Sequence, residues 1–297
     1  LPLAPPERQL VVTGAVLEDA VRAELPELPA DNILCEPCGR NTAPAIGWAA
    51  QEVCRRDPDG TMAVLPADQH IVDEEGYREV VRRAMAFASD RQHVVTLGIS
   101  PTHPETGYGY ILRGRELEDG VFEVEDFREK PDQATAQGYL ADGRYLWNAG
   151  MFFSPARVLL EELASHEPGL HDALQRMTRD NLEEMYPTLK RISIDYAVAE
   201  RSDRVSVIPG NFGWSDVGSW PSLHGFRAEG AGSFHRGRVV EISGNNNVLY
   251  AHGGVLATVG VEDLVVVHTP EATLVCPLSE AQRVREVVAA LEAEEKS

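Results

Sequence analysis

Positive charge is scarce in this chain of 297 residues. It carries 27 lysines and arginines against 47 aspartates and glutamates, which gives a formal net charge of −20. Only Lys130, Lys190 and Lys296 are lysines. So acidic a surface repels a phosphate backbone, and the composition therefore predicts no nucleic-acid partner. A nucleotide can still bind at a local site where backbone amides, Arg, Lys and a metal offset the phosphate charge. A lysine inside a motif is therefore a candidate for function.

Long apolar runs are also absent. No stretch approaches the roughly 18 consecutive apolar residues that a transmembrane helix needs, so no membrane partner is expected. The N-terminal LPLAPPERQL lacks a basic region followed by an apolar block, and we do not expect it to be a signal peptide. These features together predict a cytoplasmic protein.

Cysteine is sparse, with Cys35, Cys38, Cys54 and Cys276. Cys35 and Cys38 have CxxC spacing, but no second Cys or His pair follows at the distance typical of a zinc site. Free thiols in a reducing compartment are the favoured interpretation. The alternative is a redox pair, which would usually open a helix after a strand.

An alternation of short apolar runs with helical patterns organises the first third of the chain. The predicted strands are 9–14, 32–37, 62–68 and 93–99, and the predicted helices are 17–25, 43–57 and 74–89. This order predicts βαβ units, and hence an α/β fold with a mainly parallel, Rossmann-like sheet and helices on both faces. In such sheets ligands bind at the carboxyl ends of the strands.

The sequence pattern changes in the later parts of the chain. Residues 108–132 read as extended segments around a turn at 118–120, and from Gly237 short β-branched runs alternate with Gly, Asn, Asp and Pro turns. That spacing predicts a small β unit of stacked short strands, closed by a helix. We expect a domain of residues 1–227 and a second of 228–297, with the second serving packing or self-association, as in a homodimer.

The stretch EPCGRNTAPAI (36–46) connects a predicted strand to a predicted helix. Its Asn41 and Thr42 offer hydrogen bonds that could read a base edge, and Arg40 precedes them. The alternative is that Asn41 or Thr42 caps the helix that follows. Both functions can hold at once.

The stretch VLPADQHIVD (64–73) places Asp68 where a strand is expected to end. A lone Asp at such a place is usually a turn or cap residue, but a carboxylate there can also hold a metal. His70 is interpreted as a packed or solvent-facing histidine.

Two further stretches combine glycine, aromatic and charged residues. ETGYGYI (105–111) contains Gly107, Tyr108 and Gly109, which suit a strand whose backbone lies against a flat ligand. FREKP (127–131) contains Glu129 and Lys130. The lysine could hold a phosphate as a mobile point charge, or it could belong to a solvated turn.

The remaining stretches are YLWNAGMFFSP (145–155) and GWSDVGSW (213–220). Asn148 lies in an apolar run and is expected to be a buried amide that needs partners, of which a sugar hydroxyl could be one. Asp216 lies in a turn of small residues between two tryptophans. Asp68 and Asp216, together with phosphate oxygens, would suit an octahedral Mg²⁺ ion.

These stretches, followed by SIDYAVAE and GVEDLVVVHTPEATLV, resemble one family in their order and spacing. It is the mannose-1-phosphate guanylyltransferases, or GDP-mannose pyrophosphorylases, within the sugar-nucleotide pyrophosphorylases. The resemblance covers essentially the whole chain. It implies a glycosyltransferase A-like nucleotidyltransferase domain with a C-terminal β-helix-like unit. It also implies the reaction of GTP with mannose 1-phosphate to give GDP-mannose and pyrophosphate.

The resemblance also implies roles for individual residues. Asp68 and Asp216 would hold Mg²⁺, and Lys130 would contact the sugar phosphate. The residues expected around mannose are Gly107, Tyr108, Gly109, Glu129 and Asn148, with Asp195 in or behind the sugar-phosphate site. Arg40, Asn41 and Thr42 would lie near the guanine.

One departure from the family concerns the glycine-rich loop GGxGxRLxP, which nothing here matches. About 40 residues of a first βαβ unit are expected to be missing, through omission from the sequence or in a degenerate member. Because that loop cradles nucleotide phosphates, normal activity is not expected from this chain alone. Two alternatives stay open: a sugar-1-phosphate nucleotidyltransferase for another base or sugar, and a non-catalytic, sugar-nucleotide-binding regulatory homologue.

Overall fold

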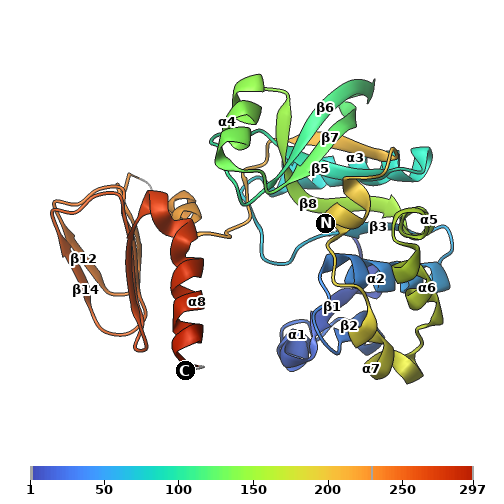
Figure 1. The fold of residues 1–297 in the computed structure, drawn as a ribbon, viewed down its shortest axis with the longest axis horizontal. Helices are drawn as coiled ribbons and strands as arrows, with labels where there is room; N and C mark the ends of the chain where they lie inside the picture. Colours follow the sequence, from blue (N-terminus) through green and yellow to red (C-terminus); the bar gives the residue numbers. More distant parts are fainter. Residues whose placement is uncertain (1–2, 229, 296–297) are drawn as a thin grey trace. The chain divides into compact units, whose positions relative to one another are not determined.

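The computed structural model describes residues 3–228 and 230–295, and its internal contacts divide the chain into two compact units. The first unit comprises residues 1–67 and 71–214, and the second comprises 68–70 and 215–297 (Figure 1). The second unit therefore includes Asp68. It also begins earlier in the chain than residue 228, where the domain boundary was predicted.

A six-stranded sheet forms the centre of the first unit (Figure 1). In sheet order the strands are β3 (Thr61–Val64), β8 (Tyr145–Pro155), β5 (Val94–Ile99), β9 (Val205–Gly210), β7 (Val121–Glu129) and β6 (Gly109–Glu118). β5 and β9 pair in parallel, whereas the other neighbours pair antiparallel. The sheet is mixed, and the prediction of a mainly parallel sheet is wrong for it.

Two features explain the mixed sheet. β8 enters between β3 and β5 and runs antiparallel to both. β6 and β7 form a hairpin that turns at Asp119 and Gly120, both with positive φ. The alternation of strands and helices correctly predicted that β3 and β5 point the same way. It carried no signal that a later strand would enter between them.

Helices cover both faces of this sheet, as predicted. On one face lie α2 (Thr42–Arg56), α5 (Ala156–His166) and α6 (Pro168–Arg176), and on the other lies α3 (Glu74–Arg91) (Figure 1). Successive side chains of a strand point to opposite faces, so Phe152 of β8 packs in the core under α2 and α5, while Phe153 packs against α3.

Local signals set the ends of these elements. Asp73 caps α3 by accepting a 3.0 Å hydrogen bond from the backbone N of Gly76, and Gln92 ends the helix in the left-handed conformation. β3 ends at Val64, so the strand predicted over 62–68 is too long. Pro66 cannot donate to a strand ladder, and Asp68 lies in a bend beyond it.

Further short elements lie outside this sheet. β1 (Val11–Gly14) and β2 (Ile33–Glu36) form a separate parallel pair, and α1 (Glu18–Glu24) follows β1. α4 (Gln133–Asp142) and α7 (Leu182–Met185) precede a π-helical turn, Asp195–Ala199. β4 (His70–Ile71) and β10 (Trp214–Ser215) form another two-stranded pair.

The second unit is a coil of short parallel strands. β11 (Phe234–Arg236), β13 (Val248–Ala251) and β15 (Leu264–His268) stack in parallel, and β16 (Thr273–Pro277) pairs antiparallel with β15. β12 (Val239–Ile242) and β14 (Leu256–Val259) form a second parallel face, and α8 (Val284–Glu295) follows. The register partners Phe234, Val248 and Val265 form the buried core of the coil. This confirms the predicted β-helix-like unit.

The four cysteines are free thiols, as predicted. Burial, together with a hydrogen bond to Glu18, raises the pKa of Cys35 to about 11. Such a thiol is a poor nucleophile, because a reactive cysteine needs a lowered pKa. Among the residues that the structure describes, no helix is long and apolar enough to cross a membrane.

Candidate functional site

Three strands bring three of the predicted residues together. Gly109, the first residue of β6, is the register partner of Glu129, the last residue of β7. A Cβ atom at Gly109 would lie 2.5 Å from Oε2 of Glu129 and 3.3 Å from Cβ of Asn148 in β8. Glycine at this position therefore lets a carboxylate and an amide lie against bare backbone.

The amide of Asn148 has a defined orientation. Its Oδ1 accepts hydrogen bonds from the backbone N of Gly150 (3.1 Å) and the Oγ1 of Thr96 (2.9 Å). Because Gly150 N can only donate, Nδ2 of Asn148 faces the other way, where it donates to Oδ1 of Asp195 at 2.9 Å. Asn148 is 8% exposed, and it is the buried, partnered amide that the sequence predicts.

Lys130 lies directly beside this group. Its Nζ is 3.0 Å from Oε1 of Glu129, and its backbone N donates to the carbonyl of Tyr108 at 3.1 Å. The Glu129 carboxylate raises the pKa of Lys130, so the ammonium group stays charged at neutral pH. The lysine side chain is 55% exposed, and its head group is therefore accessible to a ligand.

Two mostly buried carboxylates, those of Glu129 and Asp195, face the ammonium group of Lys130. Burial raises the pKa of Glu129, and the nearby charge of Asp195 raises it further. Burial also raises the pKa of Asp195, against the lowering effect of hydrogen bonds from Ser193 and Asn148 and of the charge on Lys130. An ionised carboxylate accepts hydrogen bonds and cannot donate them. The site thus offers an excess of acceptors beside one cation, which suits a ligand with several hydroxyls and one anionic group.

Aromatic rings flank the group on the β6 side. The ring of Tyr108 lies 5.2 Å from that of Trp147 and 5.4 Å from that of Trp214, edge to face in both cases. The backbone N of Gly107 donates to Glu105 at 2.8 Å, which fixes the loop before β6. The structure thus gathers in one region the predicted residues Gly107, Tyr108, Gly109, Glu129, Lys130, Asn148 and Asp195.

The start of α2 is linked to this region by a hydrogen bond to the side chain of Thr42. Asn41 has φ 69° and caps α2, with Oδ1 accepting from the backbone N of Thr42 at 2.8 Å. The hydroxyl of Thr42 accepts from the backbone N of Ile194 at 2.9 Å, one residue before Asp195. Nε of Arg40 is buried and has no hydrogen-bond partner among the described atoms. Asn41 is therefore a helix cap, and the neighbouring Arg40 carries a buried donor that lacks an acceptor.

Asp68 and Asp216 both lie in the second unit. Asp68 is exposed in a bend, and Asp216 is half-buried with its carboxylate folded toward Gly218, where a Cβ would overlap it. Within the described residues, no group of three or more His, Cys, Asp or Glu side chains could hold a metal. Mg²⁺ is commonly bound by one or two carboxylates with water and substrate phosphates.

His70 packs edge to face on Phe226, with ring centroids 4.5 Å apart. This matches its interpretation as a packed histidine rather than a ligand.

Three contacting groups were not singled out from the sequence. Thr96 orients Asn148, and its signal was a lone polar residue in the apolar run VVTLGI. Glu200 accepts a 3.0 Å hydrogen bond from the backbone N of Glu129, but its spacing of five from Asp195 does not match the α-helical period that a sequence pattern reveals. The hydroxyl of fully buried Tyr186 donates to Glu36 at the end of β2. A bond between residues this distant in sequence leaves no local pattern.

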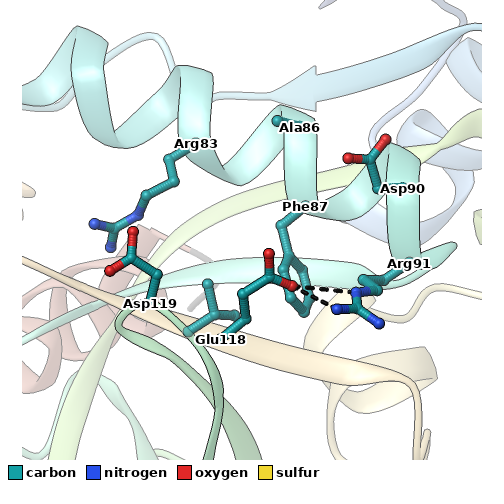
Figure 2. Close-up of a pocket in the computed structure, with 8 residues that line it drawn as sticks. Arg83, Ala86, Phe87, Asp90, Arg91, Glu118 and Asp119 are labelled. Carbon is teal, nitrogen blue, oxygen red and sulfur yellow. Dashed lines mark hydrogen bonds and ion pairs between the residues drawn. The ribbon is translucent and has the colours of Figure 1, made fainter.

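A cavity of about 420 Å³ lies elsewhere in the first unit, between α3 and the β6–β7 turn (Figure 2). Arg91 donates to Glu118 across its wall at 2.6 Å, and Arg83 extends toward Asp119. The lining residues include none of the predicted site residues. We therefore assign no part of the chemistry to this cavity.

Comparison with known proteins identifies both parts of the chain. Residues 7–230 match the family model of nucleotidyl transferases, and residues 237–291 match a mannoseP isomerase/GMP-like beta-helix domain. The mannose-1-phosphate guanylyltransferase of Escherichia coli K12 is 44% identical over 280 residues, covering 89% of this chain and 58% of that protein. The alginate biosynthesis protein AlgA of Pseudomonas aeruginosa is 37% identical, covering 92% and 59%. The chain thus spans somewhat more than half the length of these relatives.

A solved structure matches along nearly the whole chain. The crystal structure titled mannose-1-phosphate geranyltransferase, from Thermus thermophilus, is 39% identical and has a TM-score of 0.86. The match covers 98% of this chain and 86% of that one. The resemblance inferred from the motifs is confirmed by these relatives. The chain belongs to the nucleotidyl transferase family, and its C-terminal part matches the mannoseP isomerase/GMP-like beta-helix domain.

Proposed function

We propose that this chain catalyses, or forms the nucleotidyltransferase part of a protein that catalyses, the reaction of GTP with mannose 1-phosphate. The products are GDP-mannose and pyrophosphate. The names of the relatives support this activity. The observation that carries the proposal is the group of Glu129, Lys130 and Asn148 packed against Gly109, with acceptors for sugar hydroxyls beside one accessible ammonium group.

In this reaction a phosphate oxygen of mannose 1-phosphate attacks the α-phosphorus of GTP in line. The new P–O bond forms as the bond to the β-phosphate oxygen breaks, and pyrophosphate leaves from the opposite side. Such transfer depends on positioning and on stabilising charge rather than on covalent catalysis by the protein. Lys130 would hold the sugar phosphate, and its ion pair with Glu129 would orient both groups.

The sugar hydroxyls would be held by Glu129 and Asn148, with Asp195 fixing the Asn148 amide. Gly107, Tyr108 and Gly109 would lie against the sugar ring. Arg40, Asn41 and Thr42 would lie near the guanine, where the unpartnered Nε of Arg40 is a candidate contact.

Asp68 and Asp216 would hold Mg²⁺, which when bound neutralises charge on the transferring phosphates. We place the reaction in the cytoplasm. We also expect the second unit to mediate a homodimer, which size-exclusion chromatography with and without this unit tests.

The test is pyrophosphate release by the protein expressed from its complete reading frame. GTP, ATP, UTP and dTTP are each paired with mannose 1-phosphate and glucose 1-phosphate. The highest kcat/KM is expected for GTP with mannose 1-phosphate. A higher value for UTP with glucose 1-phosphate would assign another base and sugar. Binding of GDP-mannose in calorimetry without any pyrophosphate release would instead indicate a regulatory homologue.

A further inference from the structure

The backbone N–H of Glu129 needs a partner outside the β6–β7 ladder. Glu129 is the register partner of Gly109, and the neighbouring Lys130 N donates to Tyr108 O. In an antiparallel ladder, hydrogen-bonded and non-hydrogen-bonded pairs alternate. Since Lys130 and Tyr108 form a bonded pair, the N–H of Glu129 points away from β6.

The strand on that side of β7 does not reach this position. β9 pairs with β7 at Phe122 and Glu123, at the far end of β7 from Glu129. A buried N–H without a partner costs about as much free energy as a lost hydrogen bond. The Oε1 of Glu200 meets this need by accepting from Glu129 N at 3.0 Å.

The π-helical turn brings Glu200 to this point. The backbone N of Glu200 donates to the carbonyl of Asp195 at 2.9 Å, which is an i→i+5 bond. Residue 200 therefore lies one turn above residue 195. The carboxylate of Asp195 contacts Asn148, while that of Glu200 contacts the backbone of Glu129. A π turn inside a fold often marks a functional site.

Lys130, the residue that follows Glu129, has a strained backbone conformation. Lys130 has φ 49°, in the left-handed region that residues with a side chain seldom adopt, and Pro131 follows it. A strained backbone persists only where its surroundings determine it. The two bonds that fix it here are Lys130 N to Tyr108 O and Glu129 N to Glu200.

We propose that Glu200 is a positioning residue: by holding the Glu129 backbone from the π turn, it sets the direction in which Lys130 presents its ammonium group to the sugar phosphate. This rests on the proposed function of Lys130. Glu200 itself would not touch the substrate. Its role requires a hydrogen-bond acceptor at this place and does not require its charge.

The first test compares Glu200→Leu, which removes the acceptor, with Glu200→Gln, which keeps an acceptor and removes the charge. Glu184→Leu, at an exposed position in α7, is the matched control. Glu200→Leu is expected to raise KM for mannose 1-phosphate about tenfold, with KM for GTP changed by less than about twofold. Glu200→Gln and Glu184→Leu are expected to behave like the wild type. Equal impairment by Leu and Gln at position 200, or a parallel rise of both KM values, would overturn the proposal.

The second test does not depend on activity. In ¹³C-methyl NMR of reductively methylated lysines, the Lys130 signal is assigned by its loss in Lys130→Arg, and its titration can then be followed. Glu129 raises the pKa of Lys130. Glu200→Leu is expected to lower that pKa and Glu200→Gln to leave it raised. An unchanged titration in Glu200→Leu contradicts the positioning role. If the wild type forms no GDP-mannose, the proposed function fails, while this titration still decides the role of Glu200.

Discussion

Gly109 and Glu129 face each other across the β6–β7 ladder so closely that a Cβ on the glycine would lie 2.5 Å from the glutamate Oε2. The Glu129 side chain is 10% exposed, and the other oxygen of its carboxylate pairs with Lys130 at 3.0 Å. A methyl group at residue 109 would therefore displace both oxygens from their present positions.

Gly109→Ala is expected to raise KM for mannose 1-phosphate about tenfold, because displacement of a positioned group by a fraction of an ångström weakens binding at this scale. Steady-state kinetics measures it. Gly138→Ala is the matched control, since a Cβ there meets nothing within 4 Å on helix α4. It should leave the kinetics unchanged and increase the free energy of unfolding by about 1 kcal/mol. Equal KM values for the two variants would show that Gly109 is not part of the sugar-phosphate site.

Lys130→Met is expected to lower kcat/KM for mannose 1-phosphate about 100-fold, or about 2.7 kcal/mol of transition-state stabilisation. The loss follows from removing the ammonium group that lies beside Glu129 and Asp195. Lys190→Met is the control, since Lys190 pairs instead with Glu167 at 2.7 Å. It should change kcat/KM by less than about twofold. A comparable loss in the two lysine variants would mean that overall charge, rather than the site, is responsible.

Asp195→Asn is expected to increase the free energy of unfolding near neutral pH while lowering kcat/KM at least about tenfold. The pKa of Asp195 is raised above 3.8, chiefly by burial. The native state therefore binds this proton more tightly than the unfolded chain, and stability is lost as pH rises through the folded pKa. Asn removes this cost and can still accept the hydrogen bond from Asn148.

Urea unfolding across pH measures the effect. The stability gain of Asp195→Asn should be full above the folded pKa and should shrink as pH falls toward about 4. Asp180→Asn, at an exposed position, should follow the wild-type curve. A variant that is less stable than the wild type near neutral pH would show that ionised Asp195 stabilises the fold.

Asp216→Asn and Asp68→Asn are expected to reduce Mg²⁺-dependent turnover while leaving the thermal unfolding midpoint nearly unchanged. If both carboxylates bind one ion, the double variant should lose little more than the more impaired single variant, because losses at a shared site are not additive. Each single variant should also require more Mg²⁺ for half-maximal rate. A loss below about tenfold, roughly 1.4 kcal/mol, would argue against direct metal binding.

Local patterns predicted individual elements well. The helix expected over 74–89 is Glu74–Arg91, because Asp73 and the apolar period together specify where it lies. The strand expected over 93–99 is Val94–Ile99. The order of the sheet could not be predicted in this way, since the entry of β8 between β3 and β5 depends on contacts between distant segments.

In the site, too, local sequence patterns predicted some residues, whereas others depend on contacts between distant segments. Gly109, Glu129, Lys130 and Asn148 lie in unusual short stretches, and the fold brings them together as the motifs indicated. Glu200 contributes through a backbone N–H and an i→i+5 turn. Neither leaves a pattern in residue types, so only the structure places it at this site.

The most direct test of the sugar-phosphate site is a crystal structure of the protein with GDP-mannose bound. The mannose ring should lie against Gly109, with hydroxyls donating to Glu129 and near the Asn148 amide, and the Lys130 ammonium group should contact the phosphate on the sugar side. A well-ordered mannose bound elsewhere, with Glu129 and Lys130 still paired only to each other, would contradict this site.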